Sequence, residues 1–482
     1  MPKLTLHKSI KGYTYDQDKT IDPLSTARHA LSGLSSMYDL SHVRLERRYD
    51  AVNGTYSYSS LSDQLQASGK GLTNEQAQAS ASMEFAERYS WLHFDYSHYD
   101  GYQVETFERL QKGPIPTVDE GYFLENYVDL KEREKLTAEI KAIPLKWIKA
   151  YSLTLDREFY YPINWHNMVI GSNGLAAGNT LEEAIIQALG EVLERENLFK
   201  LFAEGRVARD LDQKSIKSQL VQEVLENARQ KGIEFTIKDI SFDFQATTFI
   251  VRGTSKKDKG TLAYQGVGQG TATNPEKALI RSLAEYFESY SLTKNKETEI
   301  KEKLGDDVSK YIDKFPKRHM GFHAFYNPEM LDKNAGIIQF EQLHDYARED
   351  IKEEIEELVK SLKYNVTVID KTHPTLKIPA VRVFVPGMRN MINCEINSPD
   401  IALAEIHFEA KNYEQAQKYF ERSMAGNREI RKMTSGVSVR KIFEKDYQQN
   451  MVRMMLTKKS ALDIVRDYNQ VMAAIKEKGS DE

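Results

Sequence analysis

Cysteine is almost absent from this chain of 482 residues, in which Cys394 is the single example. One cysteine cannot form an intramolecular disulfide, and its isolation is typical of a protein that works in a reducing compartment. A thiol without an identifiable partner residue is also a weak candidate for a catalytic nucleophile. A disulfide-stabilised fold is therefore excluded, and thiol catalysis is disfavoured.

Long apolar segments are missing as well. The N-terminal stretch MPKLTLHKSIKGYTYD has no apolar core of the kind that a signal peptide needs. No run of apolar residues approaches the roughly 20 that cross a bilayer as a helix. We therefore expect a cytoplasmic protein that has no membrane partner.

The charge shows no strong excess of either sign. Lysine and arginine number 66, aspartate and glutamate number 71, and the formal net charge is -5. This balance gives no electrostatic reason to expect binding to nucleic acid or to an anionic membrane. The composition, with 40% hydrophobic and 28% charged residues, is that of an ordinary globular protein. The length allows about two to four domains.

The P-loop motif GxxxxGK[ST] is also lacking. A G-x-G-x-G triplet at Gly266, Gly268 and Gly270 resembles a phosphate loop, but it is not followed at Walker or Rossmann spacing. We interpret the triplet as the glycine-rich end of a strand. The missing P-loop argues against an ordinary P-loop enzyme, but it does not argue against ATP.

One stretch, SNGLAAGNTLEEAIIQALGEVLER, carries the strongest pattern in the chain. It begins with a loop of small residues, whose glycines let backbone N–H groups approach an anion. A helix follows, because Thr180 is a good N-cap and Glu183 stands three residues later as its capping-box partner. On this helix four polar side chains share an arc of about 80°, at about 100° per residue. They are Glu183, Gln187, Glu191 and Glu194.

Carboxylates on one helix face repel one another unless a positive charge lies between them, and Mg²⁺ is such a charge. A solvated surface is the alternative for any one helix, since charged stripes are common. The pattern, however, occurs twice more. SASMEFAER contains Glu84 and Glu87, and RSLAEYFE contains Arg281, Glu285 and Glu288. The repetition favours three acidic helices that converge on one charged site.

Local patterns predict further elements. Asn53-Gly54 is a strong hairpin signal inside the alternating stretch from Val43 to Ser59. Helices are expected over about Asn74 to Leu92, Leu136 to Trp147 and Asn274 to Leu292, and the charged stretch from Lys294 to Asp307 is expected to be exposed.

Several segments resemble the successive signatures of the YcaO family. They are Lys70-Gly71, ASMEFAERYS, SNGLAAGNTLEEAIIQALGEVLERE, RSLAE and the RVFVPGM that begins at Arg382. They follow the family's order over roughly residues 15 to 395, and the long central motif is far more specific than a lone glycine loop. The resemblance implies an α/β fold with mixed sheets, in which three Glu-bearing helices surround an internal ATP cleft.

The resemblance also implies the site residues, because YcaO proteins bind ATP between metal-ligating glutamates. Motif position assigns Mg²⁺ to Glu84, Glu87, Glu191 and Glu194. It assigns contacts with the nucleotide or its metals to Ser80, Asn179, Glu183, Gln187, Arg195, Arg281 and Glu285, with Lys19 and either Ser25 or Thr26 from the N-terminal region. A salt bridge between helices is the alternative role for any single one of these residues. No catalytic base is identified.

Members of the family use ATP to phosphorylate a peptide-bond oxygen. A neighbouring Cys, Ser or Thr then gives an azoline, whereas external sulfide gives a thioamide. Azoline-forming members typically end in a proline-rich tail that reaches the active site, but this chain has no proline after Pro399. The difference favours thioamidation, or the branch linked to methylthiolation of ribosomal protein S12.

We expect two domains, a YcaO domain over residues 1–397, with core motifs over about 65–390, and an all-α domain over 398–482. Ile401 to Met424 resembles one tetratricopeptide unit. A single unit cannot bury its own apolar face, so the tail is expected to dock on the main domain, a partner protein or another protomer. The resemblance further implies a homodimer.

Two hypotheses follow for the function. The first is an ATP- and Mg²⁺-dependent enzyme that modifies a backbone amide in a peptide or protein substrate. The second is an ATP-binding accessory protein that acts as a scaffold for another enzyme. The retained Glu, Gln and Arg positions favour the enzyme, because a scaffold has no need for a cluster of like charges.

Overall fold

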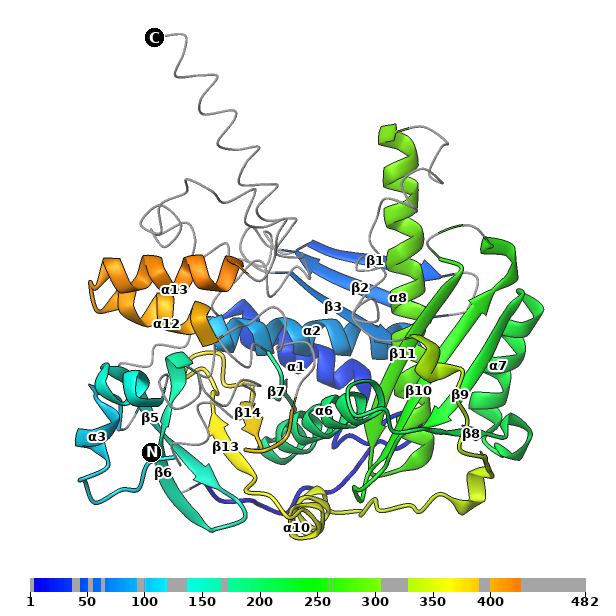
Figure 1. Ribbon diagram of the computed structural model, residues 1–482. Coiled ribbons are helices and arrows are strands. Elements are labelled where there is room, and N and C mark those ends of the chain that lie inside the picture. The colour runs from blue at the N-terminus through cyan, green and yellow to red at the C-terminus, as the bar shows by residue number, and fades with distance from the viewer. Residues whose placement is uncertain are drawn as a thin grey trace.

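The computed structural model describes residues 4–36, 44–50, 55–61, 66–92, 99, 101–118, 137–165, 172–259, 261, 263–304, 328–389 and 399–425. Within these ranges the strands form three sheets, and the helices pack between and around them (Figure 1). Mixed parallel and antiparallel pairing occurs within one sheet, where β12 joins β8 in parallel. The α/β fold with mixed sheets that the sequence predicts is confirmed.

The first sheet is a three-stranded antiparallel unit that carries the first acidic helix. Its strands are β1 (Arg44–Asp50), β2 (Thr55–Leu61) and β3 (Gln66–Gly71), and its helices are α1 (Pro23–Ser35) and α2 (Asn74–Leu92). The predicted hairpin is present as the β1–β2 pair, although its turn lies outside the described residues. Helix α2 packs so closely on β3 that a Cβ on Gly69 would lie 2.0 Å from the backbone nitrogen of Ala81. Only glycine allows this approach.

The second sheet is a layer between helices. Its strands, in the order β11-β10-β9-β8-β12, are β8 (Arg209–Leu211), β9 (Ile233–Asp239), β10 (Thr247–Ser255), β11 (Gln265–Ala272) and β12 (Ile337–Ile338). Along β10 the side chains alternate: Phe249 and Val251 pack with α7 (Gln219–Gln230) and α8 (Pro275–Leu304), whereas Ile250 packs with α6 (Leu181–Phe202). The two-residue period of a strand thus separates the two faces.

Glycine again sets the distance between helix and sheet. Gly266, Gly268 and Gly270 lie within β11 rather than at the end of a strand, so the expected position was wrong. A Cβ on Gly268 would lie 2.2 Å from the carbonyl oxygen of Ser282 in α8. The alternate glycines form one face of β11 against α8, and they serve packing rather than phosphate binding.

The third sheet has six strands, and helices pack on both of its faces. Its order is β4-β5-β13-β14-β7, with β6 paired to β5. The strands are β4 (Gln103–Glu105), β5 (Leu145–Ser152), β6 (Arg157–Pro162), β7 (Leu175–Ala177), β13 (Thr367–Asp370) and β14 (Ala380–Phe384). Helix α6 packs on β7 and β14, and α10 (Ile351–Ser361) packs on α6. Since α6 also contacts β11, it lies between the second and third sheets.

Two of the expected elements differ from the structure. Residues 137–142 are helical, but Trp147 lies in β5, because Pro144 disfavours helix at the residue before it and the residues that follow pair with β4 and β6. Helix α8 continues to Leu304, so the residues from Lys294 onward extend the helix beyond its expected end at Leu292. No glycine or proline interrupts α8 before Gly305, so nothing in the sequence ends it earlier.

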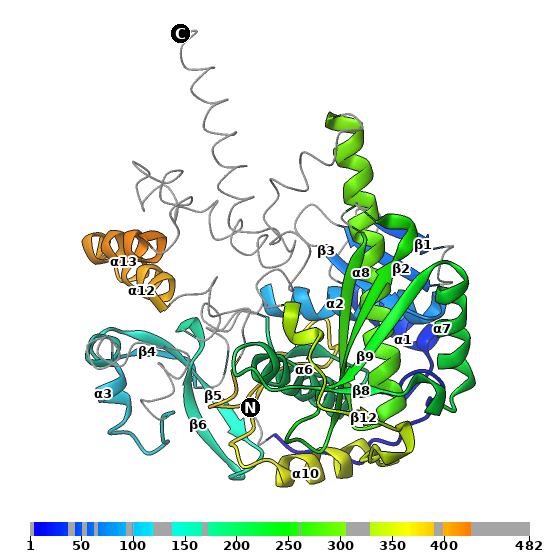
Figure 2. The same cartoon turned by 45° about the vertical axis from the view of Figure 1, so that its right-hand side comes forward.

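The C-terminal helices dock on the main domain. Helices α12 (Pro399–Glu409) and α13 (Tyr413–Ala425) lie over β4 and β5 (Figure 2), and Leu403 and Ala416 share a core with Trp147. Lys146 of β5 also pairs with Glu409 at 2.5 Å. The tetratricopeptide assignment and the domain boundary near residue 397 stay predictions, and residues 426–482 lie outside the described ranges.

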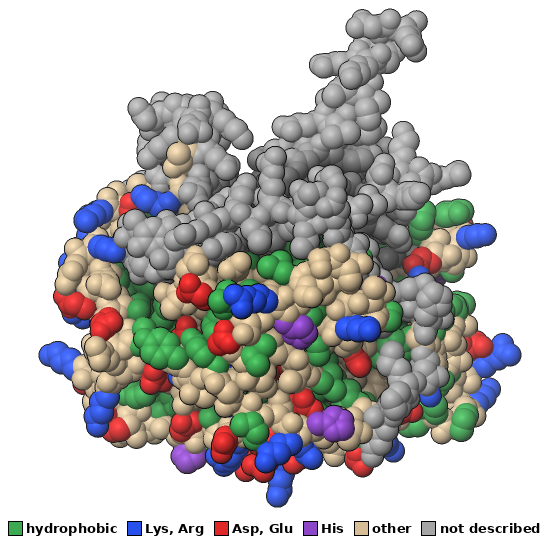
Figure 3. Space-filling model, turned by 180° about the vertical axis from the view of Figure 1, so that it is seen from behind, with side chains coloured by type: hydrophobic (Ala, Val, Ile, Leu, Met, Phe, Trp, Pro, Cys, Tyr) green, Lys and Arg blue, Asp and Glu red, His purple; other side chains and the backbone are tan. Residues whose placement is uncertain are grey.

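The surface agrees with the balanced composition. Seen from behind, acidic and basic side chains are interspersed over the described part of the molecule (Figure 3). Among the described residues, no helix combines the length and the apolar character needed to cross a membrane.

The close packing of α8 on β11 gives a testable prediction. Gly268→Ala would place a methyl group 2.2 Å from Ser282 O and 2.3 Å from Tyr286 N, and backbone atoms cannot move aside cheaply. We expect a loss of about 1–3 kcal/mol in unfolding free energy, as for other overpacked cores, measured by urea denaturation. Gly190→Ala is the matched control, since its nearest neighbour is 3.7 Å away and alanine favours a helix. Equal stability of the two variants would contradict this account of the glycines.

Candidate functional site

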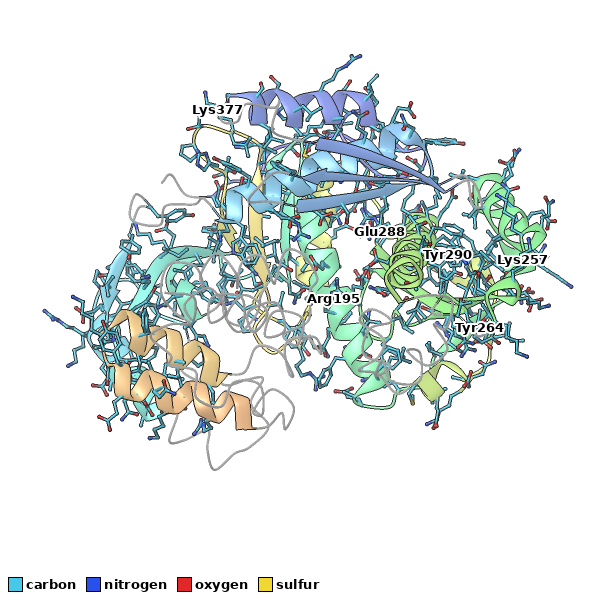
Figure 4. The ribbon with its side chains drawn as sticks, turned by 90° about the horizontal axis from the view of Figure 1, so that it is seen from above. Arg195, Lys257, Tyr264, Glu288, Tyr290 and Lys377 are labelled. Atoms are coloured by element: carbon cyan, nitrogen blue, oxygen red, sulfur yellow. The ribbon has the colours of Figure 1, made fainter. Side chains whose placement is uncertain are left out.

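The three acidic helices, α2, α6 and α8, pack on strands of all three sheets, and α6 lies in the middle of the three. Helix α2 packs on β3 and β7, α8 packs on β11 and β3, and α6 packs on β7 and β11. Seen from above, Arg195 of α6 and Glu288 of α8 lie in the middle of the molecule (Figure 4). The convergence predicted from the repeated acidic pattern is therefore present in the fold.

The N-terminal end of α6 is organised by the Glu183 carboxylate. It accepts hydrogen bonds from Thr20 N and Oγ1 at 2.5 and 2.6 Å, and from Asn179 N and Nδ2 at 2.9 and 3.0 Å. Thr180 caps the helix as predicted, accepting from Glu183 N at 3.1 Å. In a capping box the Glu183 carboxylate would accept from Thr180 N. Here it accepts from Asn179 N instead, because it also binds Thr20. Burial favours a higher pKa for Glu183, but the Lys19 charge and these hydrogen bonds hold the pKa below its usual value.

Lys19 is held beside Glu183 by a small loop of the N-terminal segment. Its backbone exchanges two hydrogen bonds with Tyr13, each 2.9 Å long. Lys277 of α8 donates to two carbonyl oxygens of the same loop, at 2.7 and 2.9 Å. Burial lowers the pKa of Lys19, against the opposing field of Glu183. A cation therefore lies at a helix N-terminus, where an anion such as phosphate binds readily.

Ser25 and Thr26, which the sequence leaves equally eligible, make different contacts. Ser25 donates its hydroxyl hydrogen to Asp22, the N-cap of α1, at 2.6 Å. Thr26 is buried and accepts from Asn179 Nδ2 at 3.0 Å. Thr26 is thus the residue of the two that touches another predicted site residue in this structure.

Farther along α6, one arginine serves two carboxylates. The Arg195 guanidinium lies 3.5 Å from Glu191 and 4.0 Å from Glu194. Burial raises the pKa of both glutamates, and the Arg195 charge opposes that shift. Gln187 is half-buried one turn before Glu191, on the same face of the helix.

Helix α2 repeats this arrangement. Arg88 Nε donates to Glu84 Oε1 at 2.9 Å, one turn away. Burial raises the pKa of Glu87 well above its usual value, and the charges of Glu84 and Glu191 raise it further. The influence of Glu191 shows that the carboxylates of α2 and α6 face a common region. Ser80 is half-buried one turn before Glu84.

Helix α8 closes the site from the third side. Arg281 NH1 donates to the carbonyl oxygen of Thr271 in β11 at 2.8 Å. Burial lowers the pKa of Arg281, and the carboxylate of Glu194 is among the charges that oppose the shift. Glu285 accepts from Gln269 Nε2 at 3.5 Å and pairs with a lysine of β3. Arginine and carboxylates from α8 therefore join those of the other two helices.

Further residues contact the predicted site residues. Lys70 of β3 pairs with Glu285 and lies 3.3 Å from Glu288, and Thr20 binds Glu183. Glu288 was already part of the repeated acidic pattern in the sequence, since it follows Glu285 at the three-residue spacing of the other acidic pairs. Thr20 could not, because its contact depends on the path of the N-terminal segment.

Arg382 of β14 is a further buried cation near the carboxylates. It is 0% exposed, donates to Asn173 O at 3.0 Å and lies 5.6 Å from the centre of the Trp91 ring. Its charge opposes the raised pKa of Glu87 and of Glu191. The RVFVPGM signature marked this residue, but only the fold shows which carboxylates it faces.

The donor set fits Mg²⁺ in kind. In the part of the chain that the structure describes, no group of three or more Asp, Glu, His or Cys side chains is arranged to hold a metal ion. Mg²⁺ does not require such a cage, because it usually keeps several waters and takes one or two carboxylates together with substrate phosphates. A divalent cation would also favour the charged form of glutamates whose pKa burial has raised.

The sequence and the fold resemble those of known proteins. A family model described as YcaO cyclodehydratase, ATP- and Mg²⁺-binding, matches residues 68–389. A protein of Methanothermobacter thermautotrophicus, named uncharacterized, is 29% identical over 341 residues, which are 66% of this chain and 80% of that protein.

Two solved structures share the fold, each at 20% sequence identity and over 80% of this chain. A heterocyclase in complex with substrate and cofactor matches with a TM-score of 0.63, over 55% of its own length, so this chain spans about half of it. YcaO from Methanopyrus kandleri, bound with AMPPCP and Mg²⁺, matches with a TM-score of 0.56 over 96% of its length.

The family model takes in all three acidic helices and confirms ATP and Mg²⁺ as the predicted cofactors. The chain belongs to the YcaO family.

Proposed function

We propose that this chain uses Mg²⁺ and ATP to activate a backbone amide in a peptide or protein substrate, for thioamidation or a related sulfur-dependent modification. The observation that carries the proposal is the meeting of half-buried carboxylates and arginines from α2, α6 and α8 in a YcaO-family chain. Buried titratable groups that perturb one another are typical of functional sites.

The carboxylates are proposed to hold the metal. Glu84, Glu87, Glu191 and Glu194 supply oxygen ligands of the type that Mg²⁺ prefers. When the metal binds, it would take over the neutralising role that Arg88 and Arg195 have in this structure. The two arginines would then be available to the phosphates, for which a guanidinium is well suited.

The nucleotide is proposed to lie between the N-terminal end of α6 and α8. Its contacts would come from Lys19, Ser25 or Thr26, Ser80, Asn179, Glu183, Gln187, Arg195, Arg281 and Glu285. Phosphoryl transfer depends chiefly on positioning and charge neutralisation, so this set needs no P-loop and no covalent catalyst.

The proposed reaction balances as follows. The amide oxygen takes the γ-phosphoryl group from ATP, and ADP leaves. Hydrosulfide then forms a bond to the amide carbon, and the original oxygen leaves with phosphate, so that C=O becomes C=S. The amide N–H is kept in the thioamide product, and the proton of hydrosulfide is transferred to the departing phosphate.

The C-terminal helices bear on the partner of this reaction. Helices α12 and α13 pack in the core beside β5. A helical tail of this kind suits contact with a partner protein or the substrate, as in an accessory factor for methylthiolation of ribosomal protein S12. We also propose a homodimer in the cytoplasm, and we propose no nucleic-acid partner.

The direct test is phosphate release with a library of candidate peptides in the presence of Mg-ATP. We expect phosphate release to increase when both peptide and sulfide are present, because the activated amide would then be consumed. Mass spectrometry of the peptide should show the replacement of one oxygen by sulfur.

Other products would point to the other functions. Loss of water from a peptide that contains Cys, Ser or Thr would indicate an azoline-forming enzyme. Binding of Mg-ATP without phosphate release under any condition would contradict the enzyme and support the scaffold.

Lys19 provides a second prediction. Lys19→Met removes a cation that the structure places beside Glu183, and we expect Mg-ATP affinity to fall at least about tenfold, the typical value of a charged hydrogen bond. Isothermal titration calorimetry would measure the change. Lys8→Met is the control, because Lys8 is an exposed lysine of the same N-terminal segment. Equal loss in both variants would contradict a specific role for Lys19.

A further inference from the structure

Lys70 differs from the other cations of the site in where it comes from. Arg88 and Arg195 neutralise carboxylates on their own helices. Lys70 instead extends from β3 to α8, where it pairs with Glu285 and lies 3.3 Å from Glu288. Its ion pairs therefore link a strand of the first sheet to the helix that packs on the second sheet.

The local sequence fixes the direction of this lysine. Gly69 and Gly71 flank it, and a Cβ on either would lie within 2.7 Å of the α2 backbone. These two residues thus face α2, and since side chains alternate along a strand, Lys70 points to the opposite side. The G-K-G sequence both brings α2 close and directs the ammonium group toward α8.

The carboxylates that meet Lys70 are poorly hydrated. The side chains of Glu285 and Glu288 are 15% and 5% exposed. Ser68 of the same strand donates its hydroxyl hydrogen to Glu288 at 2.7 Å. The charge of Lys70 also opposes the raised pKa of Glu194. Lys70 thus pairs with Glu285 and Glu288 on α8, and its charge also reaches Glu194 on α6, one of the carboxylates proposed to hold the metal.

We propose that Lys70 is a built-in counter-cation, which occupies the carboxylates of α8 until Mg²⁺ arrives together with ATP. The inference rests on the proposed function. A free metal ion must displace the ammonium group and leave it without an anionic partner, which disfavours binding. A metal bound to ATP brings phosphate oxygens, which give the displaced ammonium group a new partner. Lys70 therefore makes metal binding depend on nucleotide.

The test measures binding of Mn²⁺ alone, as a probe for Mg²⁺, by electron paramagnetic resonance on the full chain. We expect the wild type to bind Mn²⁺ weakly without nucleotide. Lys70→Met should bind it at least tenfold more tightly, because the carboxylates lose their counter-cation. Lys70→Arg keeps the charge and should resemble the wild type. Lys70→Gln, which keeps a hydrogen-bond donor, replaces Lys70→Met if that variant does not fold.

Lys146→Met is the matched control. Its side chain is 34% exposed, as is that of Lys70, and it pairs with a glutamate far from the site in the sequence. This variant should bind Mn²⁺ as weakly as the wild type. Tight Mn²⁺ binding by the wild type, or no gain in both Lys70→Met and Lys70→Gln, would overturn the inference.

Binding of Mg-ATP to the same proteins separates the two proposals. If the wild type binds Mg-ATP but the Lys70 variants gain no Mn²⁺ affinity, the counter-cation role is wrong and the nucleotide site stands. If the wild type fails to bind Mg-ATP, the proposed function itself is wrong.

Discussion

The constraint on which the site depends is the cost of holding several half-buried carboxylates close together. Glu87, Glu191 and Glu194 each have a raised pKa, and burial is the largest cause in every case. The protein offsets the repulsion with its own cations, including Arg88, Arg195 and Arg382. These cations neutralise the carboxylates only partly, so binding of a divalent cation with a polyphosphate would add a favourable interaction. Clustered carboxylates with raised pKa values are costly to keep without a function, and their presence therefore favours a bound cationic ligand.

The fold brings the charges together by close packing of helices on strands. Gly69 lets α2 approach β3, and Gly268 lets α8 approach β11. Helix α6 lies between the second and third sheets, with its N-terminal end fixed to the N-terminal segment through Glu183 and Thr20. Side chains from distant parts of the sequence therefore face one region, and that region is held by the rigid core rather than by loops.

The sequence predicted the three acidic helices, because helical periodicity shows which residues share a face, whereas the assignment of site residues stays a prediction. It predicted α2 over Asn74–Leu92, to the residue. It could not show that Lys70 reaches α8, or that Thr26 rather than Ser25 touches Asn179, since these contacts depend on how separate sheets and segments pack. The strand at Trp147 was missed because tertiary burial overrides local propensity there. The end of α8 was expected too early, although nothing in the sequence interrupts the helix before Gly305.

The most direct test of the account is calorimetric titration of Mg-ATP into the wild type and Glu191→Gln. Glutamine keeps the size of the side chain but removes the charge that would bind the metal, so we expect an affinity loss of at least about tenfold, or about 1.4 kcal/mol. Glu226→Gln, on an exposed face of α7, should bind as the wild type does. Binding that is equally strong in Glu191→Gln, or no binding by the wild type, would contradict an acidic nucleotide site around α6.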